Sequence, residues 1–249
     1  MEPLVSVVIP TYNNYSGLKN SLRSVDLQTY KNIEIIVVND GSTDPEYSKL
    51  VDNGNTRIVT MKENSVSKNK YFSDSIRNEG IKESKGKYIA FLDDDDYWLE
   101  TKLQVQIDML ENSDYLMSCS EALASFGHYE KNEELNLFNQ EINFEGIAKT
   151  FKKSKLKSRF LKKKLFYRFE FPNIFDFNFI SIHNCIITSS VIVDKQLLNK
   201  VGNFRDLQSK KFFSDWDCWL GVLTHTDCVY FKEPLLHYDL SPSMNLNPL

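Results

Sequence analysis

The chain has 249 residues, of which 41% are hydrophobic, and its formal net charge is −4. A chain of this length and composition can bury a substantial core, which excludes a protein dominated by disorder. It contains no run of about 18 apolar residues, and its first residues lack the basic region and apolar stretch of a signal peptide, so we expect a cytoplasmic protein.

Strand and helix signals alternate over roughly the first hundred residues, which predicts an α/β fold with a mostly parallel central sheet flanked by helices. Nearly continuous apolar runs predict four strands, at residues 5–9, 33–38, 57–61 and 88–92. Helical spacing of apolar residues predicts a helix after Asn13–Ser16 and the end of another at 76–84, with Gly86 as its stop signal.

The second half of the chain is less regular. We expect helices that begin near Leu99 and near Ser214, and a strand at 186–193, but residues 120–180 show no alternation of strand and helix. The simplest partition is one domain with a variable second half.

Residues 149–168 contain ten Lys or Arg and no Asp or Glu. Apolar residues interleave with these charges as they would in an amphipathic basic helix at 149–169. Such a helix can lie on an anionic membrane surface, or it can pack on its own domain with its charges in water; both readings stay open. No nucleic acid partner is expected, because the rest of the chain is acidic.

The four cysteines, Cys119, Cys185, Cys218 and Cys228, form no C-x-x-C pair. This spacing argues against a zinc ribbon and against a redox motif. We expect reduced, mostly buried thiols.

Four consecutive aspartates, at 93–96, follow directly on the apolar run at 88–92. Neighbouring carboxylates raise one another's pKa, whereas a divalent cation keeps them ionised. Oxygen ligands of this kind suit Mg²⁺ or Mn²⁺, which in enzymes commonly carry substrate phosphates. The aspartates therefore predict a metal-dependent phosphate site, and the alternative is a solvated acidic turn.

Polar residues also follow the other predicted strands: Thr11 and Tyr12 after the first and Asp40 after the second. Ligands of parallel α/β sheets bind where the loops after such strands converge. The chain has no G-x-G, which excludes the dinucleotide-binding motif. The stretch from Gly80 to Lys87 has one residue too many for a P-loop and precedes a strand.

Several of these segments together resemble family 2 glycosyltransferases of the bacterial polysaccharide and O-antigen type. The segments that carry the resemblance are 5–13, 34–44, 77–80 and 86–96, and then 201–204 and 215–220. The resemblance implies a GT-A fold in a single domain, 1–249, that inverts the sugar of a nucleotide-sugar donor. Its Rossmann-like nucleotide-sugar-binding half would be 1–115, and its acceptor-binding and catalytic half 116–249.

The resemblance implies that Pro10, Thr11 and Tyr12 line the nucleotide, with the ring of Tyr12 stacked on the base. It implies that Asp40 hydrogen-bonds the base and that Arg77 approaches the diphosphate. The residue types suit these roles, because a flat ring can stack and a carboxylate can accept a hydrogen bond from a ring N–H group such as that of uracil N3. Each residue also has a purely structural alternative: Tyr12 could be a buried aromatic at a strand end, Asp40 a turn-forming residue and Arg77 a surface charge.

The D-x-D motif of the family matches Asp93, Asp94 and Asp95, which implies a ribose contact for Asp94 and a metal ligand in Asp95. The metal, Mn²⁺ or Mg²⁺, would neutralise charge on the departing diphosphate. Asp94–Asp96 also fits the motif by composition. We prefer the first register because the family motif directly follows the Phe-Leu pair that closes the strand.

Inversion needs a general base that takes the proton of the acceptor hydroxyl. The resemblance assigns this role to Asp215, although an aspartate at a helix start can also be a cap. Two positions depart from the family pattern: Ser214 stands where the family has Glu, and Ser241 where it often has a metal-binding His.

We therefore expect a metal-dependent inverting glycosyltransferase that moves a hexose from a nucleotide sugar, with a UDP-sugar favoured, to a saccharide acceptor in cell-surface polysaccharide synthesis. The acceptor could be lipid-linked, with the protein peripheral at the inner face of the plasma membrane. The alternatives are a non-catalytic nucleotide-sugar-binding module of the same fold and a nucleotidyltransferase. The latter would want a glycine-rich basic loop after the first strand, which is absent.

Overall fold

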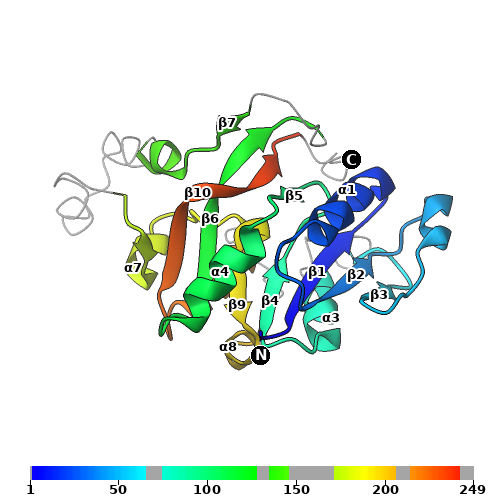
Figure 1. The fold of residues 1–249 in the computed structure, drawn as a ribbon, viewed down its shortest axis with the longest axis horizontal. Coiled ribbons are helices and arrows are strands. Elements are labelled where there is room, and N and C mark those ends of the chain that lie inside the picture. The colour runs from blue at the N-terminus through cyan, green and yellow to red at the C-terminus, as the bar shows by residue number, and fades with distance from the viewer. Residues whose placement is uncertain (1, 66–74, 128–134, 146–170, 206–213, 242–249) are drawn as a thin grey trace.

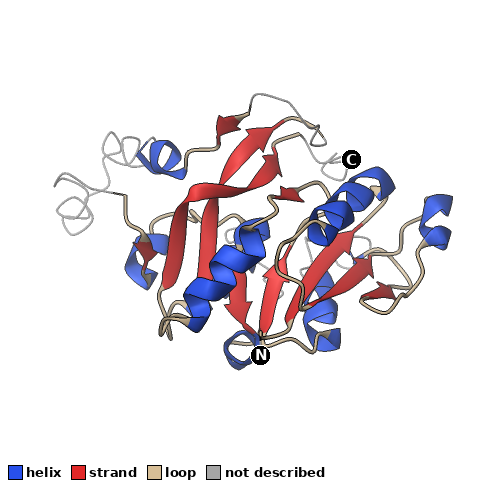
Figure 2. Cartoon of the chain, viewed as in Figure 1, coloured by secondary structure: helices blue, strands red, loops and turns tan. Residues whose placement is uncertain are grey.

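A computed structural model describes residues 2–65, 75–127, 135–145, 171–205 and 214–241. In this part of the chain a central sheet carries helices on both faces (Figure 1 and Figure 2). This arrangement confirms the α/β fold predicted from the sequence. The sheet continues from the first half of the chain into the second, and the division at residue 115 stays a prediction.

Four parallel strands form one side of the sheet, in the order β3-β2-β1-β4. Their bounds are β1 Val5–Thr11, β2 Ile33–Asn39, β3 Thr56–Thr60 and β4 Tyr88–Phe91. All four were predicted from apolar runs. β1 lies between β2 and β4, and its Val7 and Val8, which point to opposite faces, are both fully buried.

The sheet continues from β4 in the order β9-β6-β10-β5, with β7 beside β6 and β8 beside β10. These strands are β5 Tyr97–Trp98, β6 Met117–Ser125, β7 Asn136–Leu137, β8 Ile174–Phe175, β9 Ile192–Asp194 and β10 Cys228–Asp239. β9 is antiparallel to both β4 and β6, whereas β6 and β10 are parallel to each other. The longer ladders are thus parallel, as predicted.

Two features of the second half differ from the sequence prediction. The strand expected at 186–193 is shorter: a 3-10 turn, η2 (Thr188–Ser190), precedes β9. The long strands β6 and β10 were not predicted. β6 consists mainly of small and polar residues with weak strand preference, and Pro234 interrupts the register of β10, so tertiary pairing decides both.

The helices pack on two separate hydrophobic clusters, one on each face of the sheet. α1 (Tyr15–Asp26) and α4 (Lys102–Glu111) cover one face, and α3 (Ser75–Glu83), α8 (Lys195–Lys200) and α9 (Ser214–Val222) contribute to the cluster on the other. Short turns complete the described part: η1 (Pro45–Lys49) and α7 (Phe177–Ile180). The helices predicted near Leu99 and Ser214 are present as α4 and α9.

All four cysteines are buried and free, as expected. The predicted basic helix at 149–169 lies outside the described residues. Among the helices that the structure does describe, none has both the length and the apolar character needed to cross a bilayer.

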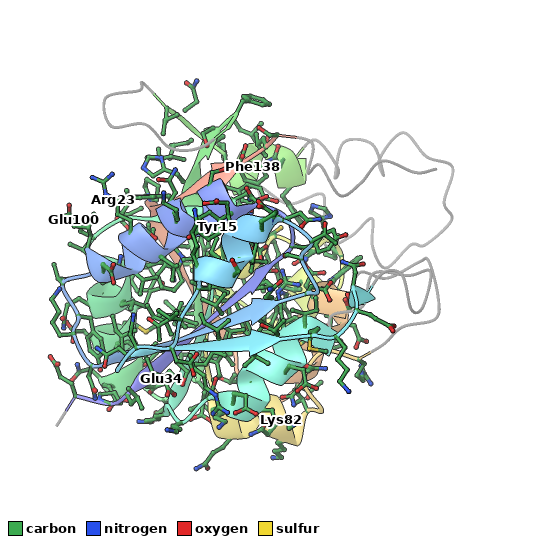
Figure 3. The ribbon with its side chains drawn as sticks, turned by 90° about the vertical axis from the view of Figure 1, so that its right-hand side faces the viewer. Tyr15, Arg23, Glu34, Lys82, Glu100 and Phe138 are labelled. Carbon is green, nitrogen blue, oxygen red and sulfur yellow. The ribbon has the colours of Figure 1, made fainter. Side chains whose placement is uncertain are left out.

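The direction of the strands places several strand ends at one edge of the sheet. Because β9 runs antiparallel to β4 and β6, β6 and β10 run in the same direction as β1 and β4. In Figure 3, Phe138 and Tyr15 lie towards this upper, carboxyl-terminal edge, and Glu34 and Lys82 lie at the lower one. The polar loops after β1, β2 and β4 therefore share an edge with the ends of β6 and β10.

Candidate active site

The aspartates at 93–96 form a tight turn at the end of β4 that is fastened to its surroundings through the backbone. The amide of Asp96 donates to the carbonyl of Asp93 over 3.1 Å. Ser21 of α1 donates to the carbonyl oxygen of Asp96 over 2.8 Å, and Ser189 of η2 accepts from the amide of Asp93 over 3.0 Å. These bonds hold the backbone of the turn, so the four carboxyl groups start from neighbouring points at the end of β4.

Crowding and burial change the acidity of these carboxyl groups. Burial is the main cause that raises the pKa of Asp94 to about 6, and the charge of Asp93 adds to it. Burial, followed by the charges of Asp93 and Asp94, raises the pKa of Asp95 to about 7. A nearby cation would relieve this repulsion, because opposite charge favours the ionised carboxylate.

Asp96 differs from its neighbours because its side chain points into the interior, where it is 2% exposed. Its Oδ1 accepts from the amide of Asp239, at the end of β10, over 2.9 Å. Burial and the charges of Asp95 and Asp93 raise its pKa well above the usual value. The side chain thus joins the turn to β10. If the D-x-D motif were Asp94–Asp96, its last carboxylate would be this buried one, which already bonds Asp239.

Arg77 of α3 forms an ion pair with Asp93, with 2.5 Å between Nη2 of the arginine and Oδ1 of the aspartate. Both side chains are partly exposed, so they are accessible from the edge of the sheet. The guanidinium also lies 5.8 Å from the ring centre of Phe204. Arg77 therefore presents a fixed positive charge beside the aspartate turn.

Asp215 lies in the first turn of α9, within electrostatic reach of this ion pair. Its Oδ2 accepts from Asn184 over 3.2 Å, and its Oδ1 accepts from the amide of Trp216 over 2.7 Å. Burial raises the pKa of Asp215, while the positive charge of Arg77 lowers it and Asp93 raises it. A carboxylate with a raised pKa is a stronger base, which suits proton abstraction.

The loop after β1 packs against Asp94. Nδ2 of Asn14 donates to the backbone carbonyl of Asp94 over 3.2 Å. Hydrogen bonding by Thr11, Asn14 and Tyr12 lowers the pKa of Asp94 and partly offsets the effect of burial. Oδ2 of Asp94 is buried and has no hydrogen-bond partner among the described residues. Tyr12 and Pro10 are half-buried at the same strand end.

Asp40, at the end of β2, is buried and already holds the segment at 64–65. Its Oδ1 accepts from the amide of Ser65 over 2.8 Å, and its Oδ2 accepts from the hydroxyl of Ser65 over 2.7 Å and from Asn64 over 3.1 Å. Burial raises its pKa. A base that binds this carboxylate would have to share it with Ser65.

The structure thus places Pro10, Thr11 and Tyr12 next to Asp94, and it places Arg77 and Asp93 near Asp215. These groups come from β1, α3, the turn after β4 and α9, which are separated in sequence and meet at one edge of the sheet.

Sequence reasoning missed several side chains that support this edge. Tyr47 bonds the hydroxyl of Thr11 over 2.5 Å, Asn184 bonds Asp215, and Ser189 bonds the amide of Asp93. Tyr238 of β10, three residues before Ser241, lies within electrostatic reach of Asp96, Asp93 and Asp95. No motif marks Tyr47, Asn184 and Ser189; only a polar or aromatic residue near a predicted strand end could have drawn attention to them.

The donor set is compatible with one particular kind of metal binding. The described residues contain no group of three or more His, Cys, Asp or Glu side chains that could hold a metal ion. Mg²⁺ sites in enzymes commonly use one or two carboxylates together with substrate phosphates and water. The crowded carboxylate of Asp95 fits Mg²⁺ or Mn²⁺ in such a phosphate-completed site.

Comparisons with known proteins point to one family. The family model described as Glycosyl transferase family 2 matches residues 6–180. An uncharacterized glycosyltransferase of Rickettsia typhi is 30% identical over 237 residues, which cover 94% of this chain and 63% of the relative. The Escherichia coli UDP-Glc:alpha-D-GlcNAc-diphosphoundecaprenol beta-1,3-glucosyltransferase WfaP is 39% identical over 117 residues, which cover 47% of this chain and 45% of that protein.

A solved structure shows the same fold. The mannosyltransferase PcManGT from Pyrobaculum calidifontis, in complex with GDP-Man and Mn²⁺, matches with a TM-score of 0.63 and 13% identity, over 98% of this chain and 59% of that one. The likeness confirms the predicted GT-A fold. The chain spans less than two thirds of the length of these three proteins.

Proposed function

The chain belongs to glycosyl transferase family 2, and from this premise we propose that it transfers a hexose from a UDP-sugar to a saccharide acceptor, with inversion at the anomeric carbon. A UDP-sugar is favoured because WfaP carries UDP-Glc in its name. The same name specifies an acceptor sugar on diphosphoundecaprenol, which supports a lipid-linked acceptor in cell-surface polysaccharide synthesis.

The observation that carries this proposal is the meeting of Arg77, the aspartate turn and Asp215 at one edge of the sheet. An inverting transfer needs a leaving diphosphate on one side of the sugar and a base on the other. Arg77 offers the diphosphate a positive charge that can form charge-assisted hydrogen bonds. Asp215, within electrostatic reach of Arg77 and Asp93, would stand on the acceptor side.

In the proposed mechanism, Tyr12 stacks on the base, Pro10 and Thr11 line the nucleotide, and Asp40 accepts from the base. Asp94 would contact the ribose through Oδ2, which has no partner among the described residues.

Asp95 would hold Mn²⁺ or Mg²⁺, which when bound supplies positive charge to the leaving diphosphate. Support for a divalent metal comes from the Mn²⁺ in the PcManGT complex and from the crowding of carboxylates around Asp95. On the acceptor side, Asp215 takes the proton of the attacking hydroxyl. The oxygen of that hydroxyl bonds to the anomeric carbon while the bond from this carbon to the diphosphate breaks.

We place the protein in the cytoplasm, where nucleotide sugars are the donors, and peripheral at the membrane that would carry a lipid-linked acceptor. The basic segment at 149–169 motivates this placement. Co-sedimentation with anionic vesicles, compared with neutral ones, measures the association.

The test of function compares Asp215→Asn with Asp217→Asn, a control two residues further along α9 whose carboxylate pairs with Arg205. Wild type should release UDP from a panel of UDP-sugars in the presence of Mn²⁺ and saccharide acceptors. Asp215→Asn should bind the donor normally and turn over at least about 100-fold more slowly, because it has lost its general base. Wild-type turnover in Asp215→Asn would remove this residue as the base. Donor binding without any turnover in wild type would favour the non-catalytic module.

A further inference from the structure

We infer that Tyr238 is an acceptor-binding residue whose hydroxyl donates a hydrogen bond to an oxygen of the acceptor sugar beside Asp215. This inference rests on the proposed function and adds to it a specific contact on the acceptor side. Tyr238 lies near the end of β10, three residues before Ser241, and no role of its own was predicted for it from the sequence.

The pairing of β10 places Tyr238 next to the aspartate turn. On one side of it in the chain, His237 pairs with Tyr97 of β5, the residue that directly follows Asp96. On the other side, the amide of Asp239 donates to Oδ1 of Asp96 over 2.9 Å. Both neighbours of Tyr238 are therefore tied to the same turn, which fixes its backbone there.

The ring of Tyr238 is also held in place. It packs edge-on against Phe138, with 5.3 Å between ring centres and an interplanar angle of 86°. Figure 3 shows Phe138 at the upper edge of the sheet, the edge that carries the polar loops. A side chain that is oriented in advance loses little entropy when it binds a ligand.

The hydroxyl of Tyr238 is available to a ligand. The hydroxyls of four other tyrosines form hydrogen bonds inside the chain: Tyr30 with Pro3, Tyr47 with Thr11, Tyr88 with Glu111 and Tyr230 with Glu121. Among the described residues, the Tyr238 hydroxyl makes no such bond, and the side chain is half-buried rather than enclosed. The hydroxyl is not one of the buried polar atoms without a partner, so it is open to solvent, and an oxygen of a ligand can take the place of water there.

The charges around Tyr238 keep its hydroxyl in the donor form. Burial raises its pKa first, and then the charges of Asp96, Asp93, Asp95 and Asp215 raise it further. The phenol is thus within electrostatic reach both of the donor-side aspartates and of the proposed base. In the proposed mechanism, the acceptor hydroxyl that attacks the anomeric carbon lies between these two groups.

The surroundings of Tyr238 suit a neutral hydrogen-bond donor. When ionised, the carboxylates around it can accept hydrogen bonds from the hydroxyls of the acceptor sugar, but they cannot donate a hydrogen bond to a lone pair of its oxygens. Tyr238 supplies the missing donor to a neighbouring oxygen of the same sugar. Its own proton stays on the phenol, while the proton of the attacking hydroxyl goes to Asp215.

The test is Tyr238→Phe, which keeps the ring contact with Phe138 and removes only the hydroxyl. The probe is the donor and acceptor pair on which wild type is active, beginning with UDP-glucose and an N-acetylglucosaminyl diphospholipid. We expect the acceptor KM to rise roughly tenfold, the loss that corresponds to one hydrogen bond. The donor Kd, the rate of donor hydrolysis without acceptor and the melting temperature should stay as in wild type. Tyr88→Phe, which loses a hydroxyl bonded to Glu111 at the start of β4, serves as control and should keep the wild-type acceptor KM.

An acceptor KM of Tyr238→Phe within about twofold of wild type would overturn the inference, since one hydrogen bond should cost more. An equal loss of donor affinity would also overturn it, because Tyr238 would then act on the nucleotide side. If wild type transfers no sugar from any donor in the panel, the proposed function fails and this inference falls with it. Failure of the proposed function and failure of the Tyr238 inference are distinguishable, because wild type is inactive only when the proposed function fails.

Discussion

Replacing Asp95 by Asn should make the metal-free protein more stable at alkaline pH while it abolishes sugar transfer. The carboxyl of Asp95 titrates near pH 7 in the folded chain, compared with an ordinary value of 3.8, because it is buried next to Asp93 and Asp94. Between these two pH values the folded state holds a proton that the unfolded state has released. The free energy of unfolding therefore falls as pH rises through this window.

The size of the effect follows from the shift. One pKa unit corresponds to about 1.4 kcal/mol, so a shift of about three units destabilises the ionised folded state by on the order of 3 to 4 kcal/mol. Asp95→Asn cannot ionise and escapes this penalty. Near pH 8 it should melt roughly 6 to 16 °C above wild type, since 1 kcal/mol moves a chain of this size by about 2 to 4 °C. Near pH 4 the two proteins should melt alike.

The assay is thermal unfolding at pH 4 and pH 8 in the presence of EDTA. Asp26→Asn, at an exposed carboxylate of α1, is the control and should change the melting temperature little at either pH. Addition of Mn²⁺ and UDP at pH 8 should stabilise wild type and leave Asp95→Asn nearly unchanged. A variant that melts at or below wild type at pH 8 would refute the assignment of repulsion at Asp95, and normal transfer activity would refute its role as metal ligand.

Two further substitutions test other parts of the structure. Arg77→Gln should weaken donor binding roughly 10- to 100-fold, which is the usual contribution of hydrogen bonds to a charged group. It should also shift the rising limb of the pH–rate profile to higher pH, because the charge of Arg77 lowers the pKa of Asp215. Titration calorimetry measures donor binding and initial rates give the pH profile. Arg57→Gln, at a surface residue that pairs with Glu83, is the control. An unchanged donor Kd in Arg77→Gln would contradict the diphosphate role. Lys102→Met should stabilise the fold by about 1 to 3 kcal/mol, because the Lys102 amine is fully buried over the ring of Trp98 with no hydrogen-bond partner among the described residues. Burial lowers the pKa of Lys102 well below its ordinary value, so the gain should shrink as pH rises; denaturant unfolding at pH 6 and pH 9 checks this, and a less stable variant would contradict it.

Much of the donor side could be predicted from local patterns. The apolar runs of β1, β2 and β4 mark buried strands, and each is followed by polar residues that share an edge once the strands are parallel. The order of strands on the other side could not be read in this way. β6 and β10 pair although about 110 residues separate them, and the sequence of β6 carries little strand preference of its own.

Local alternation and spacing in the chain were enough to indicate the fold class, the family and the aspartates at a strand end, because side-chain periodicity and motifs are properties of neighbouring residues. Long-range packing selected the roles within the aspartate turn: it turned Asp96 inwards to Asp239 and left Asp95 among like charges. It also brought Asp215 towards Arg77 and Tyr238 towards the turn. Burial and electrostatic surroundings depend on segments that are distant in sequence. The acidity of these carboxyl groups and the availability of the Tyr238 hydroxyl are therefore set by the tertiary structure.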